Sequence, residues 1–310
     1  MIYSYGVTQQ GHYHIKNNIV CQDAHALLKI SDNLCFAAVA DGLGSEQYTD
    51  VASKIASNAV IDYCKAHIDE TTANENILTE IKKAFDFALK QVFDEAEKNN
   101  HDKTQYDTTL SFVVFRGEKI YFGQSGDSGV VVLKKSGDYF AVTKQQRDES
   151  GCVFPLCFTD KWVFGEVDEV SSVLLATDGM LDTLFPSLLF NEPVNIYVAL
   201  AQFFMDNSSL GFGTNPDDVV QGKISDFIAG ISESQVNDDK TIVCVVNTSV
   251  EVQRKNEDYY RIPNWPELKK KKDEEFKRLA YPHLYKEREE TDKENTKLEK
   301  KDTSNEEEHK

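Results

Sequence analysis

The segment Leu34-Cys-Phe-Ala-Ala-Val-Ala40 runs directly into Asp41-Gly42. A short, continuous apolar run that stops at turn residues is typical of a strand buried on both faces. The sequence therefore predicts a buried strand over Leu34–Ala40, which places the carboxylate of Asp41 at the end of that strand.

Helical and strand patterns follow this segment in blocks. Apolar residues at helical spacing predict helices over about Tyr48–His67, Glu75–Lys98, Val194–Met205 and Val219–Ile231. Runs of β-branched and aromatic residues predict strands at Leu110–Phe115, Lys119–Gly123, Val130–Leu133, Tyr139–Val142, Ser172–Ala176 and Thr241–Val246. Turns at Arg116-Gly-Glu118 and Lys135-Ser-Gly137 suggest that the first four of these form an antiparallel meander. Without regular βαβ alternation, the pattern indicates an α+β fold with helices layered over antiparallel sheets.

The formal net charge of −18 is concentrated in residues 1–250, which hold about 18 basic and about 35 acidic residues. Such a surface argues against a nucleic-acid partner, because phosphate backbones are bound by clustered Lys and Arg. It suits a protein that holds hard divalent cations, although many soluble proteins are acidic without binding any.

The composition changes sharply after Val250. Charge runs occur at Lys269–Lys272, Glu287–Glu290 and Glu306–Glu308. We therefore expect a globular domain over residues 1–250 and a charged C-terminal extension over 251–310, partly disordered or helical. The aromatic stretch Tyr259–Trp265 is expected to dock on its own domain or on a partner.

The remaining signals concern location. The six cysteines form no CxxC pair and have no histidine at zinc spacing. The chain starts without the basic and apolar regions of a signal peptide, and no apolar run approaches the ~18–20 residues that span a bilayer. A cytoplasmic protein with free thiols and no membrane partner is the expectation.

Aspartates recur where predicted strands meet turns: Asp41 before Gly42, Asp178 before Gly179, and Asp238 just before a strand, with Asp23 upstream of the first long strand. Any one of them alone fits a structural turn. Together they suggest a cation site, because carboxylates repel one another unless a cation neutralises them. Four carboxylates suit two Mg²⁺ or Mn²⁺ ions that share a bridging ligand.

Six motifs in a fixed order carry a family resemblance: Gln22-Asp-Ala24, Val39-Ala-Asp-Gly-Leu-Gly44, Thr108-Thr109, Gly126-Asp-Ser128, Ala176-Thr-Asp-Gly179 and Asp238-Asp-Lys-Thr241. They resemble the metal-dependent protein phosphatase family of type 2C (PPM) over about residues 5–247. The version Cys21-Gln-Asp-Ala24, in place of the commoner Glu-Asp pair, is similar to a bacterial branch of that family.

The resemblance implies a four-layer α-β-β-α sandwich, with two antiparallel sheets flanked by antiparallel helix pairs. It also implies two ions, Mn²⁺ or Mg²⁺, and a third, weaker one in many bacterial members. The residues implied to bind or orient them are Asp41 as the bridging ligand, the carbonyl of Gly42, Asp178, Asp238, Asp23 on a metal or its water, and Asp127 with Asp178 for the third ion.

Three positions depart from the family pattern. Leu43 stands where animal members often carry a histidine that is a candidate general acid. The segment His14–Asn18 has no arginine to grip the substrate phosphate; His14 or Lys16 can substitute, or can have a surface or turn role. Gly129 replaces the arginine that commonly follows Gly-Asp-Ser. The stretch from Ser150 to Gly165 lies where the family carries a flap beside the cleft.

The activity implied is hydrolysis of phosphoserine and phosphothreonine in proteins by a hydroxide that bridges the two metals, and the partners implied are phosphoproteins and a cognate serine/threonine kinase. An alternative is a catalytically weak regulator of the same fold that binds phosphoproteins or a kinase. The presence of all four main aspartates speaks against it. Structural Ca²⁺ loops are disfavoured, because no Asp-x-Asp-x-Asp-Gly loop occurs. A small phosphoester remains an open alternative substrate.

Overall fold

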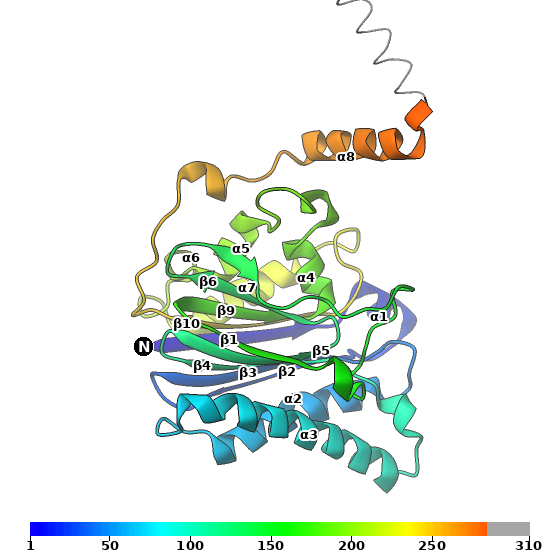
Figure 1. Cartoon of the computed structure of the whole chain (residues 1–310), viewed down its shortest axis with the longest axis vertical. Coiled ribbons are helices and arrows are strands. Elements are labelled where there is room, and N and C mark those ends of the chain that lie inside the picture. The colour runs from blue at the N-terminus through cyan, green and yellow to red at the C-terminus, as the bar shows by residue number, and fades with distance from the viewer. Residues whose placement is uncertain (284–310) are drawn as a thin grey trace, which may run out of the picture. The chain divides into compact units, whose positions relative to one another are not determined.

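A computed structural model describes residues 1–283 of the chain (Figure 1), and the predicted charge runs at Glu287–Glu290 and Glu306–Glu308 lie outside them. By its internal contacts the chain divides into two units. The larger is Met1–Ser187 with Asn191–Ile262, and the smaller comprises Leu188–Phe190 and, among the described residues, 263–283.

The larger unit is built on two antiparallel five-stranded sheets (Figure 1). The first has the order β1-β10-β9-β6-β7 and comprises Ile2–Gln9, Lys240–Asn247, Val170–Ala176, Gly129–Lys134 and Tyr139–Ala141. The second has the order β2-β3-β4-β5-β8 and comprises Asp23–Lys29, Leu34–Asp41, Leu110–Arg116, Lys119–Ser125 and Val163–Val167.

Helices cover the outer face of each sheet (Figure 1). The second sheet is covered by α2 (Thr49–His67) and α3 (Asn74–Lys98), and the first by α4 (Asp178–Leu184), α5 (Val198–Met205), α6 (Asn207–Leu210) and α7 (Asp217–Ala229). Shorter helical turns are α1 (His12–Asn17), η1 (Lys103–Tyr106), η2 (Thr159–Lys161), η3 (Ser187–Leu189) and η4 (Glu257–Tyr260). The predicted α+β class and the four-layer sandwich are confirmed.

Strand β3 shows why a continuous apolar run forms the centre of such a fold. Its residues alternate between two cores: Leu34, Phe36, Ala38 and Ala40 pack towards α2 and α3, and Cys35, Ala37 and Val39 pack between the sheets. Because side chains of a strand point to opposite faces in turn, a strand buried on both sides is expected to be apolar at nearly every position. The core between the sheets thereby fixes the end of β3, where Asp41 lies.

The predicted single meander over Leu110–Val142 is wrong. Strands β4 and β5 form one hairpin in the second sheet, and β6 and β7 form another in the first. The segment Gly126-Asp-Ser128 carries the chain from one sheet to the other, and Gly126 adopts a φ of +93°, which favours glycine. This crossing puts Asp127 at the same end of the sandwich as Asp41.

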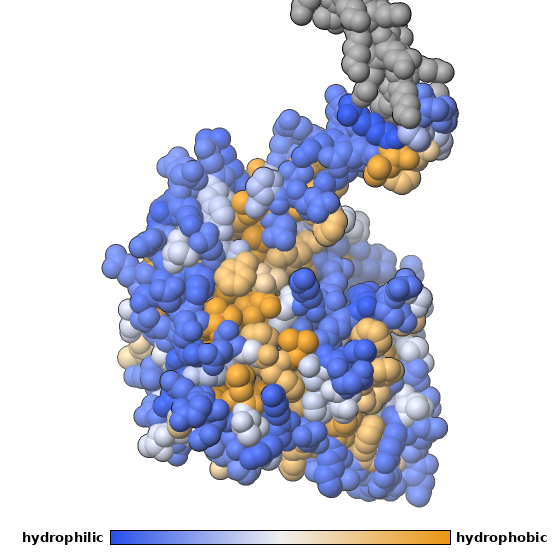
Figure 2. All heavy atoms as spheres, in the orientation of Figure 1, coloured by the Kyte–Doolittle hydropathy of each residue, from blue (hydrophilic) through white to orange (hydrophobic). Residues whose placement is uncertain are grey.

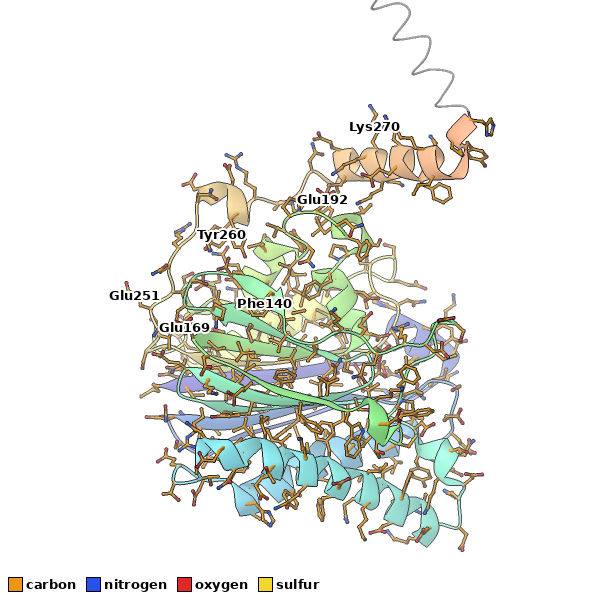
Figure 3. All side chains as sticks on the ribbon, viewed as in Figure 1. Phe140, Glu169, Glu192, Glu251, Tyr260 and Lys270 are labelled. Carbon is orange, nitrogen blue, oxygen red and sulfur yellow. The ribbon has the colours of Figure 1, made fainter. Side chains whose placement is uncertain are left out.

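The segment after β10 stays with the larger unit as far as Ile262. Val252, Tyr259 and Tyr260 pack against the apolar core beneath α5 and α7, and the Tyr259 hydroxyl accepts a hydrogen bond of 3.0 Å from the N–H of Tyr139 (Tyr260 is labelled in Figure 3). The aromatic stretch that begins at Tyr259 therefore docks, in its first part, on its own domain.

The smaller unit contains the helix α8 (Trp265–Ala280). Asn264 caps its start by accepting a hydrogen bond from the N–H of Glu267. Phe276 and Leu279 are exposed near its carboxyl end, where Figure 2 shows apolar side chains gathered. Among the described helices, none combines the length and the apolar character that a membrane crossing requires.

Candidate metal centre

Asp41 is held by hydrogen bonds on both sides of its backbone. Its N–H donates to Thr109 Oγ1 at 2.9 Å, and its carbonyl accepts from the Thr109 N–H at 2.7 Å and from Thr108 Oγ1 at 2.9 Å. Across the β2–β3 ladder Asp41 lies opposite Asp23. The Thr108-Thr109 motif thus fixes the backbone of Asp41, and this sets where its carboxylate lies.

Gly42 is required by close packing. A Cβ atom at this position would lie 2.6 Å from both the Cβ and the carbonyl oxygen of Thr49, in the first turn of α2. Since real Cβ atoms do not approach other atoms so closely, only glycine lets β3 end against this helix.

A cleft of about 580 Å³ opens over these strand ends. The charged residues among its lining are Asp41, Asp127, Asp178, Asp182, Asp238 and Arg147. One carboxylate oxygen from each of Asp41, Asp127 and Asp178 lies within 4.8 Å of the others. The structure thus brings together, in one cleft, carboxylates that are far apart in the sequence.

The crowding of carboxylates changes their acidity. Burial, then the charges of Asp23 and Asp178, raise the pKa of Asp41 well above its usual range. Burial and the neighbouring carboxylates of Asp127 and Asp238 raise the pKa of Asp178 to about 6. Both pKa values are raised because negative charges lie close together and away from water. A bound cation would offset this repulsion.

Asp23 is buried beside the cleft. Its Oδ2 accepts a hydrogen bond of 2.8 Å from Thr177 Oγ1, which in turn accepts one from the N–H of Thr241. Burial and the nearby Asp239 raise the pKa of Asp23. Asp23 therefore contributes negative charge behind Asp41 and links the ends of β2, β9 and β10.

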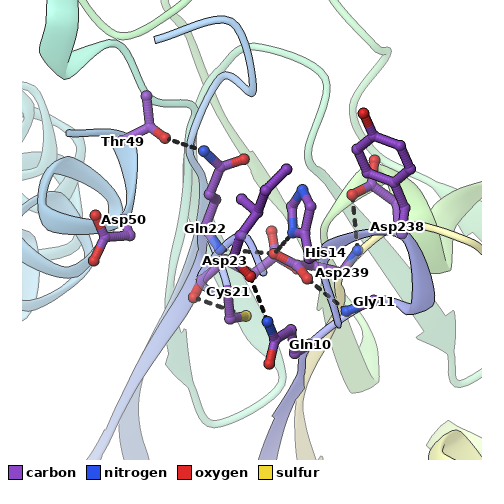
Figure 4. Close-up of polar contacts among 12 residues, drawn as sticks. Gln10, Gly11, His14, Cys21, Gln22, Asp23, Thr49, Asp50, Asp238 and Asp239 are labelled. Carbon is purple, nitrogen blue, oxygen red and sulfur yellow. Dashed lines mark hydrogen bonds and ion pairs between the residues drawn. The ribbon is translucent and has the colours of Figure 1, made fainter. Parts of the chain in front are cut away.

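The two adjacent aspartates Asp238 and Asp239 have different surroundings (Figure 4). Asp238 is exposed and lines the cleft, where its charge acts on Asp41 and Asp178. Asp239 is only 3% exposed, and its two oxygens accept hydrogen bonds from the N–H groups of Gly11 at 2.6 Å and Gln22 at 2.7 Å. The geometry favours Asp238 as the residue that faces a cation.

His14 lines the same cleft, and its Nδ1 lies 2.9 Å from Oδ2 of Asp239 (Figure 4). Of the two residues considered at this position of the sequence, His14 is thus the one that the fold brings to the cleft. Lys16 is exposed on α1 and is not among the described residues that line the cleft.

Sequence reasoning missed three features of this site. Arg147 contacts two of the aspartates, Asp182 joins the cleft one helical turn after Asp178, and Asp239 anchors the neighbouring loops. Only Asp182 had a signal in the sequence, since a residue four positions after Asp178 shares its side of a helix.

The donor set fits hard divalent cations. Carboxylate and carbonyl oxygens are the ligands that Mg²⁺ and Mn²⁺ prefer, and Asp41, Asp178, Asp238 and the backbone of Gly42 all line one cleft. The assignment of individual ligands stays a prediction.

The raised pKa of Asp178 makes the stability of the metal-free protein depend on pH. The folded protein keeps a proton on Asp178 up to about pH 6, whereas the unfolded chain releases it near 3.8. The folded state therefore binds more protons in this window, and its stability falls as pH rises through it. With excess chelator, the unfolding free energy of the wild type minus that of Asp178→Asn should fall between about pH 4 and about pH 6, measured by urea denaturation. A difference that rises with pH would contradict this assignment.

Comparison with known proteins gives one family. The family model described as Protein phosphatase 2C matches residues 10–206, which is more than half of the chain. No sequence among the curated proteins matches this chain.

Solved structures share the fold at low sequence identity. Stp1, a serine/threonine phosphatase from Staphylococcus aureus, is 13% identical with a TM-score of 0.56, and the match covers 79% of this chain and 95% of that one. The serine/threonine phosphatase PstP/Ppp from Mycobacterium tuberculosis is 16% identical with a TM-score of 0.51, covering 79% and 98%. The S. agalactiae serine/threonine phosphatase is 13% identical with a TM-score of 0.54, covering 79% and 99%.

Proposed function

Since the chain belongs to the protein phosphatase 2C family, we propose that it is a metal-dependent serine/threonine protein phosphatase. The observation that carries this proposal is the acidic cleft, in which oxygens of Asp41, Asp127 and Asp178 converge within 4.8 Å and which Asp238 also lines. A fold kept only as a binding module has no need of such mutually repelling carboxylates.

Asp41, Asp178, Asp238 and the Gly42 carbonyl would hold two divalent ions, Mn²⁺ or Mg²⁺, with Asp41 as a ligand to both, and Asp23 would add negative charge from beside the cleft. When bound, two ions would activate a water for attack on phosphorus and offset the charge on the phosphoryl oxygens. The chain itself contributes position: Thr108 and Thr109 fix Asp41, and Asp239 ties together the segments that border the cleft.

A cysteine-based mechanism does not fit the site. None of the described residues that line the cleft is a cysteine. Burial and the adjacent Asp107 raise the pKa of the Cys157 thiol to about 12, and burial with Asp239 raises that of Cys21 further. Thiols in this state are poor nucleophiles.

The direct test is turnover of a phosphothreonine peptide with Mn²⁺, with and without excess chelator. We expect hydrolysis that requires the metal. Folded protein that shows no turnover with Mn²⁺ or Mg²⁺ would instead favour the non-catalytic regulator that binds phosphoproteins or a kinase.

The substrates we propose are phosphoserine and phosphothreonine proteins, with a cognate serine/threonine kinase as a partner. The acidic larger unit argues against nucleic acid. A cytoplasmic location is consistent with the six cysteines, all of which are free thiols in the structure.

We propose residues 1–250 as the catalytic domain and 251–310 as an extension. Deleting Pro263–Lys310 should leave metal-dependent turnover unchanged, because the cleft residues all belong to the larger unit. Deleting from Glu251 also removes Val252, Tyr259 and Tyr260 from the core, so it should lower the melting temperature while the folded protein keeps its activity. Loss of turnover in the shorter deletion, from folded protein, would place part of the active site in the extension.

A further inference from the structure

A guanidinium group sits between two of the cleft aspartates. Arg147 Nη2 lies 2.6 Å from Asp127 Oδ2 and 3.1 Å from Asp178 Oδ2. Arg147 is the one Lys or Arg among the described residues that line the cleft. Asp127 and Asp178 are the pair to which the family resemblance gives a third metal ion.

The backbone beside Arg147 is fixed at this position. Gln146 donates its N–H to the Gly126 carbonyl at 3.1 Å, and its side-chain oxygen accepts from the Gly126 N–H at 2.9 Å. The side-chain amide of Gln146 also donates to the carbonyl of Lys161 at 2.9 Å. Gln146 is therefore tied to the residue that precedes Asp127, which holds the start of the Arg147 side chain next to its partner.

The other side of Arg147 is also ordered. Arg147 pairs with Val153 in an antiparallel bridge, and Asp148 closes the intervening turn by accepting from the N–H groups of Ser150 and Cys152 at 2.8 and 2.9 Å. The arginine thus stands at the base of a small hairpin, and its place beside the acid pair is set by the fold of that hairpin.

Asp127 needs a permanent counter-charge. It is 2% exposed, and its Oδ2 lies 2.6 Å from the guanidinium of Arg147. A buried carboxylate is either protonated or paired with a cation, and Arg147 supplies that cation from within the chain.

We propose that Arg147 is the resident cation of the Asp127–Asp178 pair, so that this phosphatase binds two divalent ions where the family resemblance implies three. The proposal rests on the proposed function, since it concerns the same cleft. The guanidinium forms an ion pair with one oxygen of each carboxylate, and its positive charge repels a metal ion that would bind between the same two carboxylates. It contacts Oδ2 of Asp178, so the other carboxylate oxygen of Asp178 would remain available to hold an ion.

The number of Mn²⁺ ions bound per chain tests this directly. It can be measured from the electron paramagnetic resonance signal of free Mn²⁺ during titration of the full-length protein. We expect two ions for the wild type and one more, weakly bound, for Arg147→Ala. Arg147→Lys keeps a positive charge at the pair and should stay at two. The double variant Arg147→Ala/Asp127→Asn removes the vacated site and should return to two.

Two further variants serve as controls for net charge and for the folding of Arg147→Ala. Arg261→Ala removes an arginine that pairs with Asp258 on the surface, and it should not change the count although the net charge changes equally. Asp127→Asn alone should also leave two ions, so the result does not depend on the folding of Arg147→Ala.

Three bound ions in the wild type, one ion lost on Asp127→Asn, or no ion gained by folded Arg147→Ala would overturn the proposal. None of these results would argue against metal-dependent hydrolysis as the activity of the protein. Failure of the proposed function would be seen differently, as absence of Mn²⁺ binding or of metal-dependent turnover in the wild type.

Discussion

Asp41→Asn is expected to lower metal-dependent turnover of a phosphothreonine peptide by about 10²–10³-fold or more, the scale for losing one preorganised electrostatic contact at a reacting centre. The substitution keeps the shape of the side chain and its backbone hydrogen bonds to Thr108 and Thr109, but it removes the charge at the centre of the acidic cluster. Asparagine is a weaker ligand for hard cations than a carboxylate, and Asp41 is the residue that we place between both ions.

The same substitution should make the metal-free protein more stable. Burial and the surrounding carboxylates disfavour the charge on Asp41, as its raised pKa shows, so removing that charge relieves repulsion when no cation is present. Lower turnover together with a higher melting temperature in chelator would separate loss of function from unfolding. Asp62→Asn, on the exposed side of α2, is the matched control and should change neither property. Wild-type turnover in Asp41→Asn would exclude a bridging role.

The sequence predicts the central strands of this fold better than its edges. Strands β3, β4, β9 and β10 are mainly apolar because both of their faces are buried, and the Leu34–Ala40 run of β3 is the clearest case. The three strands that were not predicted, β1, β2 and β8, all lie at sheet edges. Edge strands carry more polar residues on their solvated side, as Val163–Val167 does with Glu166, so their pattern resembles that of a loop.

Some residues of the candidate site could likewise be predicted from the sequence, and others could not. Asp41, Asp178 and Asp238 could be singled out because each stands where a strand meets a turn, a relation between near neighbours in the sequence. Arg147 could not, since it lies in a stretch without regular periodicity and its partners come from other parts of the chain. The anchoring role of Asp239 was equally hidden, because Gly11, which donates a hydrogen bond to it, is 228 positions away.

The second large effect is expected from the adjacent pair Asp238 and Asp239, and it concerns the stability of the fold. Asp239→Ala should lower the free energy of unfolding by about 2–6 kcal/mol, because a buried N–H without an acceptor costs about 1–3 kcal/mol and this substitution leaves two of them. The donors are the N–H groups of Gly11 and Gln22, and His14 loses its partner as well. Asp239→Asn keeps one acceptor oxygen and should lose less. Urea denaturation in chelator measures these changes without contributions from metal binding.

Asp238→Ala is the matched control one position away. It should affect turnover and metal binding, whereas Asp239→Ala should affect stability. The side chain of Asp238 is exposed, and within the described part of the chain it accepts one hydrogen bond, from the N–H of Asp239, so the metal-free protein should lose much less stability than with Asp239→Ala. Turnover and Mn²⁺ affinity should nevertheless fall, because Asp238 lines the cleft and its charge acts on both Asp41 and Asp178. If Asp239→Ala instead abolished metal binding in a folded protein of normal stability, the ligand would be Asp239. The roles assigned to the two aspartates would then be reversed. A metal ligand must share the cation with the other cleft carboxylates, because that cation offsets the repulsion among them.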